Sequence, residues 1–247
     1  MSDSPADSSR LNPLDSASSR AILLIETGVV IALAVLPSID VSIRLFNDPL
    51  HRASYTIYQN FASTLQHTVT VTIPALFIMW RSGSPWDSFG IVRIKWVRDS
   101  LLTIGAYAGS ILLIWGVMWG IYLSVPSGAY RFIGHGWNIG SNFRGPQQQS
   151  DYLLLPVLCC LIGFREELIF RGYLINRFER IFNSTFAAVI FSSLLFGFMH
   201  LYQGWYGVIS TASLGLVYAI FFARFRRLWP LVAAHAVTDF IGFIRIH

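Results

Sequence analysis

The stretch GFREELIFRGY, residues 163–173, places four charged side chains within seven positions of an otherwise apolar segment. Glu167 and Arg171 are four residues apart, so they share one helix face in the order that favours an ion pair. Glu166 and Arg171 are five apart and point in different directions, which leaves Glu166 without an obvious local partner. Arg165 is expected to reach an interface or a partner on another helix. An unpaired carboxylate in apolar surroundings is suited to act as a general base.

Two later apolar segments also carry ionisable groups. His200 ends SSLLFGFMH, one turn after Phe196, and His235 and Asp239 are four apart in WPLVAAHAVTDFIGF. A charge at the bilayer centre costs at least ~2.5–3.5 kcal/mol, so such groups need a reason. Peptide hydrolysis requires an activated water and a donor for the developing oxyanion. One glutamate and two histidines can supply both. No role is expected for the other histidines, which are His51, His67, His135 and His247.

The elements that carry these groups are predicted to be membrane helices. The 247 residues are 54% hydrophobic and only 13% charged, against about 25% charged residues in a soluble domain. Seven apolar segments approach the ~20 residues needed to cross ~30 Å of hydrocarbon. They are residues 21–43, 55–80, 99–124, 152–175, 185–201, 206–223 and 229–246. We expect an all-α polytopic membrane fold with about seven (six to eight) transmembrane helices.

Residues 1–20 are rich in Ser, Asp and Pro and are expected to be a disordered tail. Residues 21–247 then form a single transmembrane domain. Eleven Arg and Lys residues fall on the side of the N-terminus and five on the other, which predicts a cytoplasmic N-terminus. The loop 126–150 is either a lid that admits substrate or an ordinary connector. The third span has two pairs of glycines at four-residue spacing, Gly105 with Gly109 and Gly116 with Gly120. This spacing favours close packing of the span against other helices of the fold over dimerisation.

Three short motifs carry a family resemblance. They are Glu166-Glu167-x-x-x-Arg171, Phe196-x-x-x-His200 and His235-x-x-x-Asp239, in that order and each on a predicted membrane helix. Together they resemble the CPBP intramembrane proteases, formerly called Abi, which include the endopeptidase that trims prenylated CAAX proteins. The resemblance covers roughly residues 150–245, which would form the catalytic core. The N-terminal half matches only as generic membrane helices.

The resemblance implies a glutamate-dependent peptidase. Glu166 and His200 would activate the attacking water, with Glu167 and Arg171 as a supporting ion pair. His235 and the residue four after it would stabilise the oxyanion. Many members have Asn where this chain has Asp239, and an ionised Asp cannot donate, so Asp239 would be protonated, orient His235 or bind a metal. No cofactor is favoured; Zn²⁺ held by Glu166, His200, His235 and Asp239 is the alternative. The chain has no HExxH and no GxSxG motif, which disfavours a zincin or a serine hydrolase.

The expected partners are a peptide or protein substrate in the membrane and the lipid bilayer, with no nucleic acid. The expected location is a bacterial plasma membrane, as a multi-pass protein. Two other functions stay open. The polar groups can belong to a non-catalytic interaction or bacteriocin-immunity protein, or to a proton-coupled transporter. No internal repeat and no paired broken helices, the usual pointers to a transport site, are found.

Overall fold

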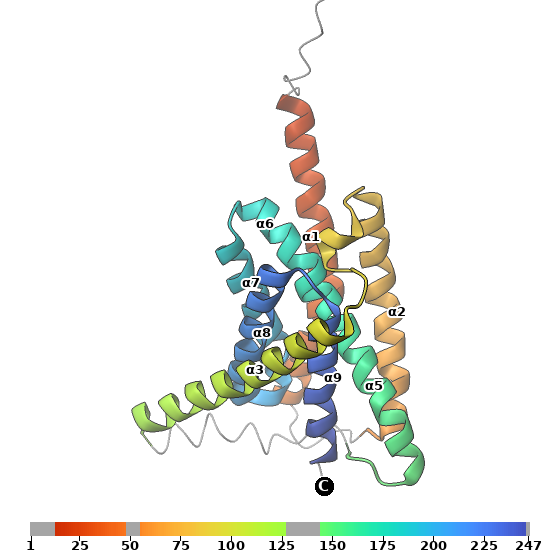
Figure 1. The fold of residues 1–247 in the computed structure, drawn as a ribbon, viewed down its shortest axis with the longest axis vertical. Coiled ribbons are helices and arrows are strands. Elements are labelled where there is room, and N and C mark those ends of the chain that lie inside the picture. Colours follow the sequence, from red (N-terminus) through yellow and green to blue (C-terminus); the bar gives the residue numbers. More distant parts are fainter. Residues whose placement is uncertain (1–12, 48–54, 127–143, 246–247) are drawn as a thin grey trace, which may run out of the picture.

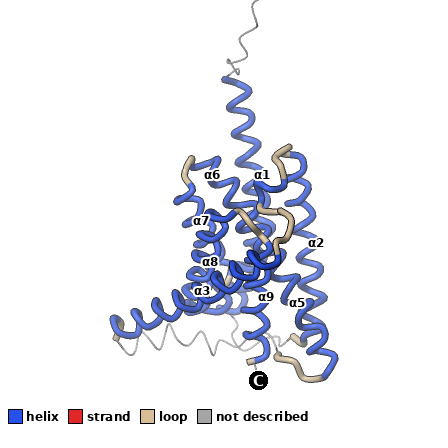
Figure 2. Tube along the Cα trace, viewed as in Figure 1, coloured by secondary structure: helices blue, strands red, loops and turns tan. Residues whose placement is uncertain are grey.

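The computed structural model describes residues 13–47, 55–126 and 144–245, and this part of the chain consists of helices and loops without a strand (Figure 2). The predicted all-α fold is confirmed. The helices are α1 (Pro13–Asn47), α2 (Ile57–Arg81), α3 (Trp96–Ser124), α5 (Gln149–Glu167), α6 (Asn176–Phe182), α7 (Thr185–Met199), α8 (Gly204–Phe225) and α9 (Trp229–Ile244). A π-helix (Leu168–Ile175) joins α5 to α6, and two 3-10 turns (Trp86–Phe89 and Leu201–Gln203) precede α3 and α8.

Four described helical segments are long and apolar enough to cross a membrane: Ser19–Arg44, Ile57–Arg81, Trp96–Ser124 and Leu201–Phe225. The other three expected spans differ. Two are short apolar helices, α7 and α9. The third is the charged segment formed by α5 and the π-helix, which carries the GFREELIFRGY sequence. These three elements, together with His200 directly after α7, hold all of the predicted site residues.

The N-terminal boundary differs from the expectation. The helix α1 begins at Pro13, whereas a disordered tail was expected as far as residue 20. Proline suits the first turn of a helix because its missing N–H has no intrahelical partner there. The remainder of that tail, residues 1–12, lies outside the described residues, as do most of the 126–150 loop and His51, His135 and His247.

The helix α5 lies between α2 and α9 and packs against both (Figure 1). On the other side of the bundle α7 and α8 form a closely packed pair. The long α3 crosses in front of the others at a steep angle and contacts α8 and α9. This arrangement surrounds the end of α5 with the helices that carry the histidines.

The glycines of α3 divide into two pairs. A Cβ atom on Gly105 or Gly109 would lie 3.4 Å from Phe221 or Val217 of α8, so these glycines serve the close packing that was expected. A Cβ on Gly116 or Gly120 would meet nothing within 4 Å. The expectation is wrong for this second pair, because the C-terminal half of α3 diverges from the bundle (Figure 1).

An ion pair fixes the start of α3 to the turn between α8 and α9. Arg227 donates from Nε and Nη2 to the two carboxylate oxygens of Asp99, at 2.5 and 2.7 Å. The same turn is tied to the segment before α3, since the Trp229 indole donates to the Val92 carbonyl at 2.9 Å. The hydrogen bond with Asp99 also raises the pKa of Arg227 above its usual range. These contacts set the position of α9, and therefore of His235.

Candidate active site

The charged segment changes its helical geometry at the predicted site. Glu166 and Glu167 are the last two residues of α5, and Arg171 lies in the π-helix that follows. All eight residues of the π-helix are buried. π-Helices are rare and are often found at functional sites. The break in regular α-helix therefore coincides with the residues that the sequence singled out.

Glu167 and Arg171 form a fully buried ion pair. Arg171 Nη1 donates to Glu167 Oε1 at 2.8 Å, and the two side chains are 1% and 0% exposed. The Arg171 guanidinium lies 4.3 Å above the Phe196 ring and also faces Tyr218. Opposite charge and aromatic faces together compensate a buried cation. The pair thus links α5, the π-helix, α7 and α8.

Glu167 also holds His235. Its Oε1 atom lies 2.7 Å from Nδ1 of His235 on α9. Because Oε1 belongs to a carboxylate that already accepts from Arg171, Nδ1 carries the hydrogen and donates it. Nε2 is then turned toward Glu166 Oε2 at 3.6 Å and Asp239 Oδ2 at 3.7 Å. Glu167 is therefore a positioning residue that fixes the tautomer and orientation of His235.

The approach of α5 to α9 depends on a glycine. A Cβ on Gly163 would lie 3.0 Å from the Val232 carbonyl oxygen and 3.3 Å from His235 Cβ. Such distances are tighter than most real Cβ contacts, so any larger residue would push α9 away. Gly163 lies one turn before the two glutamates, and its small size keeps His235 within reach of them.

Glu166 has a partner that the sequence did not predict. Arg165 Nη2 donates to Glu166 Oε1 at 2.7 Å, although these residues are adjacent and Arg165 was expected to reach elsewhere. A long arginine side chain can fold back along its helix, and in an apolar environment the nearest opposite charge is favoured. Glu166 Oε2 has no hydrogen-bond partner among the described residues. One oxygen of this carboxylate is therefore held by a hydrogen bond, and the other has only the longer approach of His235 Nε2 at 3.6 Å.

His200 caps the C-terminus of α7. Its Nδ1 lies 2.8 Å from the Phe196 carbonyl oxygen, which can only accept, so Nδ1 donates. In the neutral ring Nε2 then carries a lone pair. The ring lies against Phe196, with centroids 4.9 Å apart, and is 8% exposed. Phe196 thus supplies both the carbonyl that sets the tautomer and the surface that holds the ring.

A cavity of about 350 Å³ brings these groups together. Glu166, His200, His235 and Asp239, which come from three elements, all line it. Asp239 Oδ2 has no hydrogen-bond partner among the described residues. Two carboxylates and two imidazole rings thus line one cavity, an arrangement able to bind and activate water.

A comparison with protein families matches residues 148–241 to the family described as Type II CAAX prenyl endopeptidase Rce1-like. The matched region contains all three motifs. The resemblance carried by the motifs is confirmed over these residues. No curated protein and no solved structure matches the chain. At the level of the family, the Rce1-like match supports a membrane protease of the CAAX type.

The Rce1-like region does not supply the whole cavity. Asn60 and Thr64 of α2, outside the matched residues, also line it. Within the matched residues, Tyr202 and Gln203 after α7 line it without having been predicted. One local signal points to the α2 residues, the polar run SYTIYQNFASTLQHTVTV in the second span. His67, for which no role was expected, borders a second, water-sized cavity of about 10 Å³ together with Arg165 and Glu166.

Zn²⁺ was the alternative to a metal-free site in this Rce1-like region. In the part of the chain that the structure describes, no group of three or more His, Cys, Asp and Glu side chains is placed to hold a metal ion. Glu166, His200, His235 and Asp239 are thus not gathered into such a group in this structure. The metal-free reaction and the Zn²⁺ alternative both remain predictions.

Proposed function

We propose that this protein is an intramembrane endopeptidase that hydrolyses a peptide bond of a membrane-associated or lipid-modified substrate. The observation that carries the proposal is the unpaired Oε2 atom of the buried Glu166, which faces His235 Nε2 in a cavity shared with His200. A buried acceptor without a partner is costly unless a water or a ligand completes it. Here the natural complement is the water that attacks the substrate.

In the proposed reaction Glu166 takes a proton from this water. The oxygen of the water then forms a bond to the carbonyl carbon of the substrate, and the carbonyl electrons move onto its oxygen. His200, whose Nε2 is an acceptor in the neutral ring, helps to align the water. Collapse of the tetrahedral intermediate breaks the carbon–nitrogen bond. The proton held by Glu166 passes to the leaving amine, which restores the carboxylate.

His235 is proposed to stabilise the oxyanion. Its Nδ1–H is held by the Glu167 carboxylate, which favours a protonated ring with a second N–H at Nε2. That N–H is directed to the space near Glu166 and Asp239. A preorganised donor of this kind lowers the barrier because it meets charge that develops only in the transition state.

Asp239 stands where many family members have Asn, and an ionised carboxylate cannot donate to an oxyanion. We assign it the role of orienting His235, whose Nε2 lies 3.7 Å from its Oδ2. When protonated, Asp239 can itself donate. The cavity also exposes the amides of Asn60 and Gln203, which can hydrogen-bond the backbone of an extended peptide.

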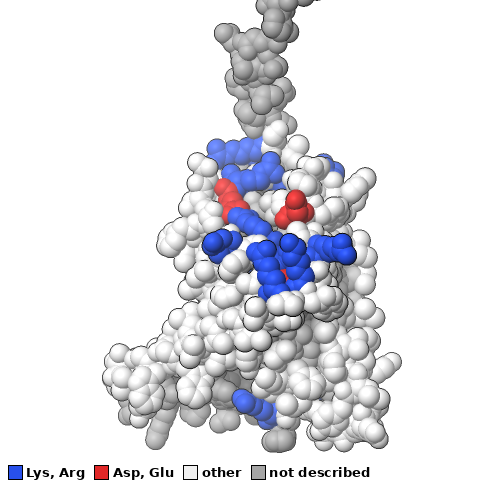
Figure 3. Space-filling model, in the orientation of Figure 1, with Lys and Arg blue, Asp and Glu red and all other residues white. Residues whose placement is uncertain are grey.

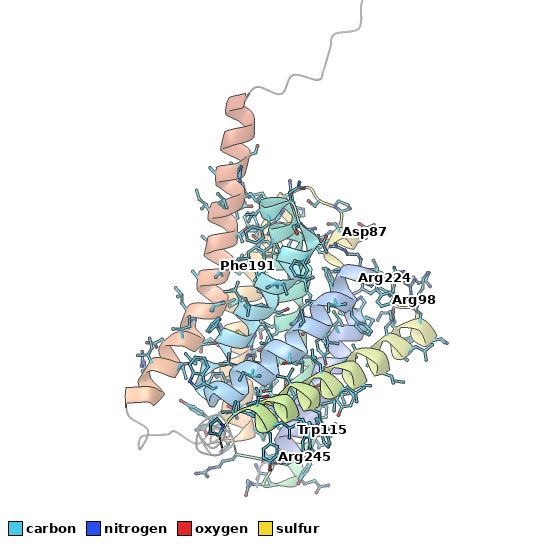
Figure 4. All side chains as sticks on the ribbon, turned by 90° about the vertical axis from the view of Figure 1, so that its left-hand side faces the viewer. Asp87, Arg98, Trp115, Phe191, Arg224 and Arg245 are labelled. Carbon is cyan, nitrogen blue, oxygen red and sulfur yellow. The ribbon has the colours of Figure 1, made fainter. Side chains whose placement is uncertain are left out.

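The N-terminus is proposed to lie in the cytoplasm. Basic side chains gather toward one end of the molecule on the face seen in Figure 3, and the opposite end shows little basic surface there. Arg98 and Arg224 lie toward the end where the basic side chains gather, whereas Arg245 lies at the opposite end of the molecule (Figure 4). The end rich in arginine faces the cytoplasm under the positive-inside rule, and α1 enters the bundle from that end (Figure 1).

The test compares N- and C-terminal peptides of membrane proteins from cells that express the native chain or Glu166→Gln at equal abundance. Glu179→Gln, which makes the same change outside the cavity, is the control. Products present with the native chain and Glu179→Gln but absent with Glu166→Gln would identify both activity and substrate. Identical profiles for all three would exclude the water-activating role and favour a non-catalytic interaction protein.

A further inference from the structure

Arg165 occupies a place in the cavity that the proposed mechanism does not use. Among the described residues that line the 350 Å³ cavity it is the single Arg or Lys. It also borders the water-sized cavity on its other side. Its side chain is 12% exposed, whereas the Arg171 side chain is 1% exposed. Arg165 therefore has open space beside it where Arg171 has none.

The two arginines also differ in how fully they are bonded. Arg171 donates to Glu167 and more weakly to the Gly215 carbonyl, and it is stacked on aromatic rings. Arg165 makes a single hydrogen bond within the described part of the chain, from Nη2 to Glu166. A guanidinium has five N–H donors. Most of the donors of Arg165 therefore remain for a ligand in the cavity.

We propose that Arg165 binds a carboxylate group of the substrate and so makes the enzyme selective for peptides with an acidic group near the scissile bond. The inference rests on the proposed function, because it names the substrate class of the same cavity. A guanidinium and a carboxylate form short, charge-assisted and often bidentate hydrogen bonds. In a buried cavity such bonds are stronger than in water.

The position of Arg165 explains how an acidic group can enter at all. Glu166 and Asp239 line the cavity, and either carboxylate would repel a second one. A fixed positive charge beside Glu166 offsets that repulsion at one point and thereby selects where the acidic group lies. Because Arg165 also holds Glu166, a carboxylate bound to it would sit next to the residue that activates water.

Two sources can supply this carboxylate: the C-terminus of the substrate, or an Asp or Glu side chain near the cleaved bond. The first source implies cleavage close to the C-terminus, and the second implies an internal acidic sequence. Both use the same chemistry at Arg165. The alternative is that Arg165 acts only through Glu166, in which case it affects all peptides equally.

The experiment uses the full-length protein in detergent with a synthetic peptide pool made in matched forms. One pair of pools carries either a free C-terminal carboxylate or a C-terminal amide. A second pair carries either Asp and Glu or Asn and Gln. Cleavage is measured for the native chain, Arg165→Gln, Arg165→Lys and Glu166→Gln. Arg165→Lys keeps the charge but loses the planar guanidinium that can donate two parallel hydrogen bonds. The elution profile of this variant in size-exclusion chromatography checks that the protein is still folded.

We expect the native chain to cleave one carboxylate form at least about tenfold faster than its neutral counterpart, the scale of a lost charged hydrogen bond. The pair that shows this preference identifies the source of the carboxylate. Arg165→Gln should bring the ratio of the two rates close to one, whatever the absolute rates, and Arg165→Lys should keep part of the preference.

Equal native rates on both forms, with cleavage that depends on Glu166, would overturn this inference and leave the proposed function intact. The inference also fails if Arg165→Gln lowers both rates by one factor, since Arg165 then acts only through Glu166. Absence of cleavage, or cleavage that persists in Glu166→Gln, would overturn the proposed function and this inference with it.

Discussion

The Oε1 atom of Glu167 lies 2.7 Å from Nδ1 of His235, which comes 68 residues later in the chain. The same oxygen accepts from Arg171 at 2.8 Å. One buried atom therefore joins α9 to the π-helix. The second glutamate of the motif is a structural anchor in this arrangement, and the first is left to face the cavity.

Removal of the anchor should destabilise the protein. Glu167→Ala leaves Arg171 buried without its counter-charge, and we expect a loss of about 3–5 kcal/mol in the free energy of unfolding. Thermal unfolding in detergent measures it. Asp40→Ala is the matched control, because Asp40 and Arg44 form an exposed pair with the same spacing, worth about 0–1 kcal/mol. Addition of Arg171→Met to Glu167→Ala should recover stability; no recovery would contradict this explanation.

His200→Ala should lower kcat by about 100- to 10,000-fold, the usual range for general acid–base groups, with a much smaller change in KM. The reason is that the lone pair on Nε2 aligns the water but does not bind the peptide. Initial rates over a range of substrate concentrations separate the two constants. Phe198→Ala, a change on a side chain that is 46% exposed and does not line the cavity, is the control. A rise in KM alone would assign His200 to substrate binding.

Asp239→Asn should keep activity within about tenfold of the native chain, because an amide can donate to an oxyanion and has nearly the same shape. Asp239→Leu should lose at least about 100-fold, since it removes both the orienting oxygen and any donor. Initial rates on one substrate measure both variants. If Asp239→Asn proves inactive, the carboxylate itself is required, and the proposed orienting role must be replaced.

Gly163→Ala should slow the reaction by about 10- to 100-fold while the protein stays folded. The added methyl group presses on the Val232 carbonyl and on His235 Cβ, and small displacements of catalytic groups have effects of this size. Gly116→Ala adds the same methyl group on α3, where nothing lies within 4 Å. It should leave the rate unchanged. Full activity of Gly163→Ala would show that α9 tolerates the shift.

The ion pair between Asp99 and Arg227 should contribute to both stability and activity. Asp99→Asn removes the charge and one of two strong acceptors, for which we expect about 1–3 kcal/mol of lost stability. The turn before α9 then loosens, so the rate should fall as well. Thermal unfolding and initial rates measure the two effects. An unchanged melting temperature would mean that Trp229 and the backbone contacts suffice to hold the turn.

The residue types and their order predicted the family and three of the elements that carry the site. They could not predict the hydrogen bond between Arg165 and Glu166, because helix periodicity places adjacent side chains about 100° apart and ignores the reach of arginine. Nor could they predict the π-helix, which depends on packing around Arg171. Asn60 enters the cavity through the contact of α2 with α5. The polar run of the second span marks α2 as unusual, but it does not show which helix α2 meets.

The shortness of α7 and α9 has a consequence for the surrounding lipid. Their 15 and 16 residues correspond to about 22–24 Å, less than the ~30 Å hydrocarbon core. A bilayer meets such mismatch by thinning beside the short helices. His200 ends one of them, so the thinned membrane brings bulk water nearer to the cavity. Under the proposed function, we expect the acyl-chain length of the host membrane to affect how readily water reaches the cavity.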